Sequence, residues 1–393
     1  MQVKQLMSRG AILAMGSVLL YTAFASAGWN HGYTQAELGM PSIFPDDPKV
    51  TMRRSIAEFH GNGKRVSDDL KTKTVSAFQY NLLQEEPFLF EAVAHMRNGN
   101  KVMVPKLLEE ARRRNPRSTE VRIFLLDHYL STGNVAASIN ELGVLKQLLP
   151  AASEPLASTA INLLAEPKTR ELAVKAIRTS PMRMAILNDL ARYGASAYLI
   201  LAITPDLKRS PDGSDGIIDA FISRGDVSGA YQLWAQTQST DPSKGQARIR
   251  NESFNEKPNP PFGWKLFANP SGTSEIRDGA AQITHSGASS DVLLSQLLML
   301  PPGSYRLSFE TEKGAENATN FVWRLDCVGG SERLLELPLA SLYSFEKQTA
   351  DRFVVPPQGC PGQWIVLAGR VLEIAKTRTV KINWVSIDRE LAR

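Results

Sequence analysis

The last third of the chain, residues 251–393, has a hydrophobic period of two. Tyr305, Leu307 and Phe309 alternate with polar residues. Because successive side chains of a strand point to opposite faces, such runs predict half-buried strands with one apolar face. Turn-forming residues such as Pro301-Pro302-Gly303 separate the runs. Short alternating strands with Pro/Gly turns predict an antiparallel β-sandwich over residues 251–393.

The middle of the chain has a helical period, and the pattern repeats. Gly99 and Gly133 each interrupt an amphipathic pattern, and Pro116 and Pro150 each end one, so both pairs are 34 residues apart. A helix–turn–helix unit of 34 residues is the tetratricopeptide period, and residues 84–150 resemble tetratricopeptide repeats. The alternative is a coincidence of spacing.

A further turn of the same kind is predicted at Ser223–Tyr231, out of phase with the first two. The stretch 156–207 is also predicted to be helical, but its repeats have no clear register. These patterns predict a multidomain α + β protein with an irregular α-solenoid. The predicted parts are a signal peptide or membrane anchor (1–27), a linker (28–73), a tetratricopeptide-like helical domain (74–240) and a β-jelly-roll module (251–393).

The N-terminus has the order of a secretory signal. Lys4 and Arg9 precede an apolar run from Ala11 to Ala25, and Ala25-Ser26-Ala27 supplies the small residues read at a cleavage site. Retention as an inner-membrane anchor through residues 11–27 is the alternative. In both cases we expect an exported protein of the periplasm or cell envelope.

Both cysteines, Cys327 and Cys360, lie in the C-terminal module. Because exported proteins reach an oxidising compartment, a disulfide between them is expected, and it would contribute about 3 kcal/mol. Two buried free thiols are the alternative.

Charge and motifs argue against several function classes. The formal net charge is only +5, and no basic run beyond Arg112-Arg113-Arg114 suggests a nucleic-acid surface. The five histidines are scattered, and the chain has no nucleophile elbow or phosphate loop. We therefore expect no catalytic residues, no cofactor and no nucleic-acid partner. Glu310 and Glu312 are the weak candidates for paired glycosidase carboxylates.

Three stretches of the last third resemble galactose-binding-like β-jelly-rolls, including carbohydrate-binding modules of the family 4/9/22 type. They are the opening Asn251–Asn255, the strand entry Leu300–Leu307 and the closing Ile382–Ile387. The resemblance implies a sandwich with a sugar groove on one face. It also implies a structural calcium near the opening and closing acids, but Asn255 and Asn383 occupy those places. Since calcium favours carboxylate oxygens, we expect no required metal.

Sugar sites combine aromatic rings with a few polar groups. Trp264 and Tyr343 fall in expected loops and are the predicted stacking residues, with Arg324 and Asp326 as polar companions. For each ring the alternative is a place in the core. Trp323 is expected in the core, and Trp364 is expected to pack on the disulfide.

Three functional hypotheses follow: two are non-enzymatic, and the third, an unrecognised carbohydrate-active enzyme, ranks last. In the first, the helical repeats dock a protein partner and the jelly-roll contacts a polysaccharide, for example during exopolysaccharide export or assembly. In the second, the chain is a protein-binding scaffold and the jelly-roll is a structural cap. An exposed Trp264/Tyr343 platform would favour the first, and a sandwich face buried against helices would favour the second.

Overall fold

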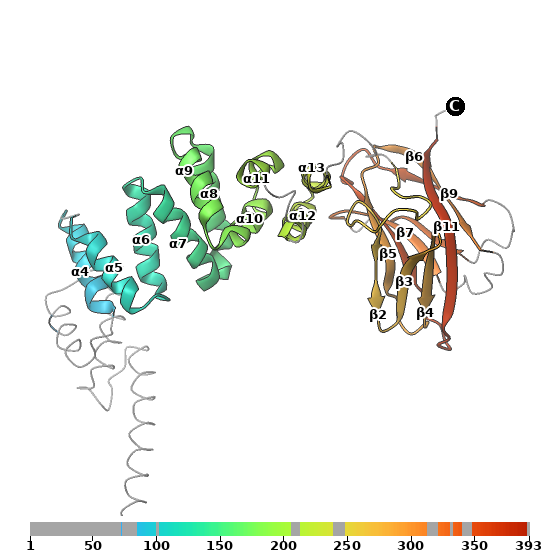
Figure 1. Ribbon diagram of the computed structural model, residues 1–393, viewed down its shortest axis with the longest axis horizontal. Helices are drawn as coiled ribbons and strands as arrows, with labels where there is room; N and C mark the ends of the chain where they lie inside the picture. The colour runs from blue at the N-terminus through green and yellow to red at the C-terminus, as the bar shows by residue number, and fades with distance from the viewer. Residues whose placement is uncertain are drawn as a thin grey trace, which may run out of the picture. The chain divides into compact units, whose positions relative to one another are not determined.

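The computed structural model describes Thr72 and residues 85–99, 102–205, 213–238, 248–312, 321–330, 333–339 and 348–390. The predicted signal segment 1–27, the predicted linker apart from Thr72, and Tyr343 lie outside the described residues. The chain divides into two compact units, Met1–Leu156 and Ala157–Arg393 (Figure 1). A helical region is followed by an all-antiparallel sandwich of two sheets, as the two hydrophobic periods predict. None of the helices in the described ranges has the length and apolarity to cross a membrane.

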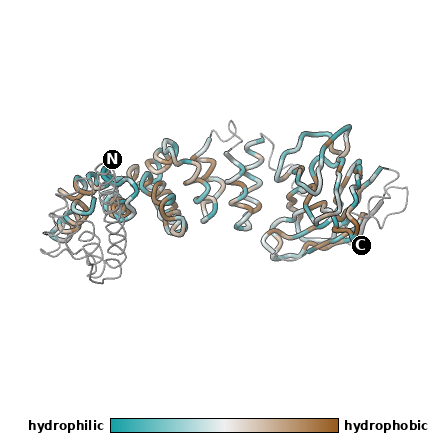
Figure 2. The backbone as a smooth tube through the Cα atoms, turned by 90° about the horizontal axis from the view of Figure 1, so that it is seen from below, coloured by the Kyte–Doolittle hydropathy of each residue, from teal (hydrophilic) through white to brown (hydrophobic). Residues whose placement is uncertain are grey.

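The described helices of the first unit form two hairpins, along which hydrophobic and hydrophilic residues alternate (Figure 2), and α4, α5 and α6 share one buried apolar cluster. The helices are α4 (Glu86–Arg97), α5 (Val104–Arg114), α6 (Thr119–Ser131) and α7 (Val135–Leu148), followed by the short turn η1 (Pro150–Ala152). Gly99 and Gly133 form the turns with positive φ, a conformation that glycine adopts without steric cost. Both 34-residue units are therefore helical hairpins at the predicted places.

Further helices continue the pattern across and beyond the boundary between the units. They are α8 (Ser153–Ala165), α9 (Pro167–Thr179), α10 (Arg183–Arg192), α11 (Ala197–Ile203), α12 (Ser214–Ser223) and α13 (Val227–Thr237). The α12–α13 turn repeats the α6–α7 turn in detail. Asn134 accepts a hydrogen bond from Ala137 N, and Asp226 accepts one from Gly229 N. The predicted turn at Ser223–Tyr231 is therefore confirmed, with the polar residue after the turn glycine capping the next helix.

A buried carboxylate connects the first two hairpins. Glu141 on α7 accepts hydrogen bonds from Arg112 of α5 at 2.9 Å and from Arg122 of α6 at 2.8 Å. The other two arginines of the basic run, Arg113 and Arg114, pair with a glutamate one turn earlier on their own helix. The basic run lies at the end of α5, as expected, and its three arginines also form intramolecular ion pairs, which the sequence analysis did not predict.

The sandwich consists of two sheets with their apolar faces together. The five-stranded sheet has the order β1 (Lys265–Leu266), β5 (Val292–Leu298), β10 (Gln363–Gly369), β7 (Phe321–Cys327) and β8 (Arg333–Pro338). The six-stranded sheet has the order β2 (Ala268–Asn269), β3 (Gly272–Arg277), β4 (Ala280–His285), β11 (Arg378–Arg389), β6 (Gly303–Thr311) and β9 (Gln348–Val355). Strands distant in sequence pair at the centre of each sheet, so the fold is set by non-local contacts.

The core between the sheets contains the residues that the alternation assigns to it. Leu307, Phe309, Trp323 and Leu325 are buried there. Tyr305 is also buried, donating its hydroxyl to Pro301 O at 2.7 Å. This alternation of buried and outward residues along β6 and β7 confirms the predicted half-buried strands.

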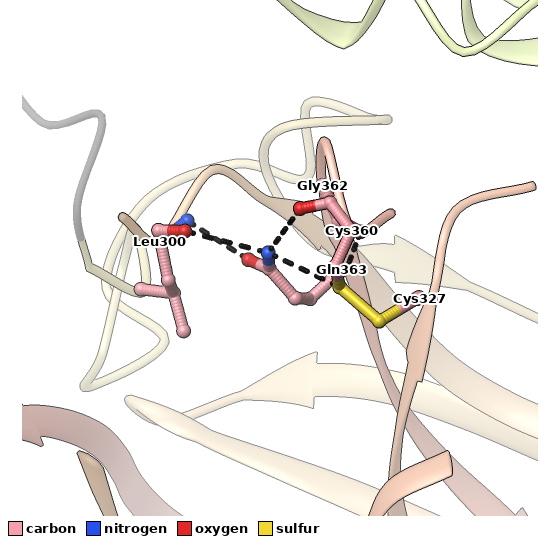
Figure 3. Close-up of a disulfide and its surroundings, with 5 residues drawn as sticks. All are labelled: Leu300, Cys327, Cys360, Gly362 and Gln363. Carbon is pink, nitrogen blue, oxygen red and sulfur yellow. Dashed lines mark hydrogen bonds between the residues drawn. A yellow bond between two sulfur atoms is a disulfide. The ribbon is translucent and has the colours of Figure 1, made fainter. Parts of the chain in front are cut away.

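Cys327 and Cys360 form the expected disulfide (Figure 3). Beside it, the fully buried side chain of Gln363 accepts a hydrogen bond from Leu300 N at 2.8 Å and donates to Cys360 O at 3.3 Å. A buried amide needs such partners because an unpaired polar group in the core is costly. The disulfide thus belongs to a corner where the start of β10 is fixed both covalently and by hydrogen bonds. A bridge of this kind is typical of an oxidising, exported environment.

Candidate functional site at the junction of the last helix and the sandwich

One face of α13 is apolar and packs on the sandwich. Val227, Tyr231 and Trp234 follow the spacing i, i+4, i+7 and are all buried, which places them on one side of the helix. The ring of Phe262 contacts both aromatic residues, at 5.0 Å from Tyr231 and 5.5 Å from Trp234 between ring centroids. The end of the helical region and the sandwich therefore share one aromatic cluster.

The loop that carries Phe262 is fixed to the five-stranded sheet. Leu297 N on β5 donates a hydrogen bond to Pro261 O at 2.8 Å. One residue earlier on the strand, the buried side chain of Gln296 pairs with both backbone groups of Arg250, at 2.9 Å and 3.0 Å. These bonds hold the chain that enters the sandwich and attach the residue before Phe262 to β5.

The disulfide corner meets the same helix. A Cβ added to Gly362 would lie 2.9 Å from a methyl group of Val227 and 3.1 Å from Leu298 O. Glycine is needed at this position because real Cβ atoms do not approach other atoms so closely. The first turn of α13 therefore rests on the segment between Cys360 of the disulfide and the start of β10.

Charged groups accompany the aromatic contacts. The Arg250 guanidinium lies 4.9 Å from the centroid of the Trp234 ring, within cation–π range. On α12, burial raises the pKa of Asp219, and the positive charge of Lys265 on β1 opposes that rise. Both observations place the last helical hairpin against the β1–β5 edge of the sandwich.

A polar cavity of about 160 Å³ lies beside this junction. Its lining includes Trp234, Arg250 and Trp264, with the remainder supplied by Gln238, Asn251, Glu256, Lys257, Asn259 and Gly263. The indole N–H of Trp234 and one N–H of Arg250 are buried and have no hydrogen-bond acceptor in the described ranges. Such a space suits ordered water or a small polar molecule.

Trp264, the first predicted stacking residue, is 1% exposed and belongs to the core. Its ring packs near Phe254 and Trp323, and its Nε1 donates to Asn251 O at 3.0 Å. Trp264 does lie in a loop, directly before β1, but the residues there fold inward between the sheets and bury the ring. Its ring is therefore not presented at the surface for stacking. Tyr343, its predicted companion, falls outside the described residues.

Arg324 and Asp326 lie on the outer face of β7, away from the core, as their alternation predicts. Arg324 donates to Ser290 Oγ at 3.2 Å, and Asp326 accepts from Arg333 Nε at 3.0 Å. They share a sheet face with each other but not with Trp264. The predicted set of four is thus not brought together among the described residues.

Trp364 lies elsewhere than expected. Its neighbour in the strand, Gln363, faces the disulfide, so Trp364 points outward and is half-buried on the outer face of the five-stranded sheet. There it lies opposite Asp326 of β7 and Leu297 of β5. Sequence alternation within β10 is weak because both faces of this strand are largely apolar, and only the register shows which side is the core.

Glu310 and Glu312, the weak candidates for paired glycosidase carboxylates, each contact other side chains. Glu310 accepts hydrogen bonds from Trp384 Nε1 at 2.7 Å and Asn383 Nδ2 at 3.1 Å. Glu312 lies 3.8 Å from the ammonium group of Lys381. Within the described ranges, no group of three or more His, Cys, Asp or Glu side chains is arranged to hold a metal ion.

The aromatic cluster and the cavity were not predicted from the sequence. The available signal was the apolar spacing on α13 and the aromatic residue after Pro260-Pro261, but nothing local indicates that these segments meet. Comparison with known proteins finds no family model and no curated protein that matches this chain.

Proposed function

We propose that the protein is a non-enzymatic scaffold exported to the cell envelope. Its sandwich is a structural cap on the helical array, and its helices dock a protein partner. The observation that carries the proposal is the junction, where Phe262 of the sandwich completes the apolar face of α13. A helical array must cover the exposed apolar face of its last unit, and terminal caps serve this purpose in solenoids.

The finer fold assignments are part of the proposal. The repeated Gly turn with its Asn134 or Asp226 cap supports tetratricopeptide-like units. The two antiparallel sheets support a jelly-roll of the galactose-binding-like type, which the opening, strand-entry and closing stretches resemble. The disulfide supports export.

Apolar side chains on the outside of the helices support a docking role. Ile123 and Leu130 are exposed one above the other on α6, and Leu172 of α9 and Tyr198 of α11 are exposed on the second unit. Single exposed apolar residues are ordinary, but their recurrence along a repeat array is typical of surfaces that bind other proteins.

The cap can be tested by Phe262→Ala, which removes the ring that contacts both Tyr231 and Trp234. Truncation of a buried Phe costs about 3–5 kcal/mol. If the sandwich supports the helix, amide hydrogen exchange in α12 and α13 should accelerate by at least about 100-fold and up to roughly 4,000-fold, since 1.4 kcal/mol corresponds to a factor of ten.

Phe353→Ala is the matched control, because Phe353 is equally buried but stacks on Tyr305 inside the sandwich. It should destabilise the sandwich without a selective effect on α13. Unchanged exchange in α13 of the Phe262→Ala protein would remove the basis of the cap proposal.

A second candidate function, contact with a polysaccharide, is favoured by one observation. Trp364 is half-buried on the outer face of the five-stranded sheet, with Asp326 opposite it and Arg324 one pair further along. An aromatic ring beside charged hydrogen-bonding groups suits a sugar. Affinity electrophoresis of the full chain in polysaccharide gels should then show retardation that Trp364→Ala abolishes and Trp384→Phe preserves. Equal mobility in every gel would exclude this second function.

A further inference from the structure

The loop between β10 and β11, residues 370–377, exposes two large apolar side chains that are three positions apart in the chain. Val371 is 63% exposed and Ile374 is 82% exposed. Of the two residues between them, Leu372 is turned inward instead. Its N–H donates to Gly287 O at 3.0 Å, and its side chain packs closely on Gly287, where an added Cβ would lie 3.0 Å from a Leu372 methyl group. The loop is thus held by one apolar residue while two others face solvent.

One basic residue lies on each side of this apolar pair in the sequence. Arg370 precedes Val371 and Lys376 follows Ile374, and both are exposed. Glu373 is the one acidic residue among positions 370–377. Two apolar side chains at a loop tip, with cations on both sides, are complementary to a surface that has an anionic outer layer over an apolar interior.

The loop lies at the end of the sandwich opposite the helix junction. Gly362, before β10, contacts α13, and the loop follows Gly369 at the other end of that strand. At about 3.3 Å per residue, seven residues separate the two places by roughly 20 Å. In Figure 1 the loop is the turn at the lower end of β11. The α12–α13 hairpin therefore does not cover it.

We propose that this loop docks the protein on a lipid bilayer with anionic headgroups. Val371 and Ile374 enter the boundary between headgroups and acyl chains, while Arg370 and Lys376 remain among the headgroups. This lipid contact is separate from the docking of a protein partner by the helices.

The test places a probe in the loop, so that any membrane binding by residues 11–27 does not enter the signal. The full chain carrying Ile374→Cys is labelled with an environment-sensitive fluorophore and mixed with vesicles. The vesicles contain either 30% phosphatidylglycerol in phosphatidylcholine or phosphatidylcholine alone. Val354→Cys is the matched control, because Val354 is also exposed and apolar but lies on β9 beside Ser304, at the other end of the sandwich.

We expect a blue shift of the label at position 374 with anionic vesicles, quenching by lipids that carry a nitroxide on the acyl chain, and neither effect at position 354. Arg370→Gln with Lys376→Gln should raise the lipid concentration at half-saturation about 25-fold, taking about fivefold for each cation near the surface. The proposal is overturned if position 374 gives no shift, or if its shift is the same with neutral vesicles and indifferent to the two cations. A shift of equal size at both labelled positions would also overturn it.

Discussion

Removal of the disulfide is the perturbation whose effect the structure sets most directly. Cys327 and Cys360 are 33 residues apart in sequence. In the chain-entropy relation, a closed loop of this length lowers the free energy of the native state relative to the unfolded state by about 3.7 kcal/mol at 25 °C. Replacing both cysteines by alanine should cost about this amount, because Ala keeps the Cβ and introduces no unpaired polar group.

Urea unfolding followed by tryptophan fluorescence measures this effect. With a slope near 2.5 kcal/mol per molar urea, typical of a domain of this size, the midpoint should fall by about 1.5 M. Reduction of the wild-type protein should produce the same shift, since it opens the same loop. A shift below about 0.4 M in both experiments would refute the loop-closure reasoning.

The disulfide should also influence α13, because that helix contacts the chain two residues after Cys360. Because Gly362 contacts Val227, opening the bridge should accelerate amide exchange in the first turn of α13 more than in α10. Equal acceleration in both helices would mean that the bridge stabilises the sandwich only globally.

Three further predictions concern single contacts. Gly369→Ala should lower the free energy of unfolding by about 2–3 kcal/mol, because the new Cβ would lie 2.2 Å from the buried ring of His285. A urea midpoint equal to that of the wild type would contradict this. Glu141→Gln should lower the free energy of unfolding by about 3–5 kcal/mol, because two arginines lose their shared buried carboxylate. Thermal unfolding followed by helical circular dichroism should show a clearly lower midpoint. An unchanged midpoint would count against the ion-pair argument. The hydrogen bond from Arg113 is the largest cause that lowers the pKa of Glu110 to about 2. This pair therefore stabilises the fold above pH 4.5, and its contribution is lost as the pH falls toward 2. Arg113→Gln should return the pKa of Glu110, followed by NMR titration, toward 4.5.

The sequence was sufficient for features that depend on local order. The turn glycines at 99 and 133, the helix caps and the alternation along β6 and β7 all lie where local pattern places them. The reason is that a helix or strand imposes its period on the residues within it, whatever surrounds them. The pairing of Cys327 with Cys360 was also accessible, because the chain contains only these two cysteines.

Tertiary structure alone decided which aromatic residues are exposed. Trp264 was expected at the surface and is in the core, whereas Trp364 was expected on the disulfide and faces outward. The difference arises because the burial of a ring depends on the strand or helix that covers it, and those partners are distant in the sequence. The same reason applies to Phe262, which sequence analysis did not identify. Its role became visible only in the fold, where it contacts both Tyr231 and Trp234, because these contacts depend on non-local packing.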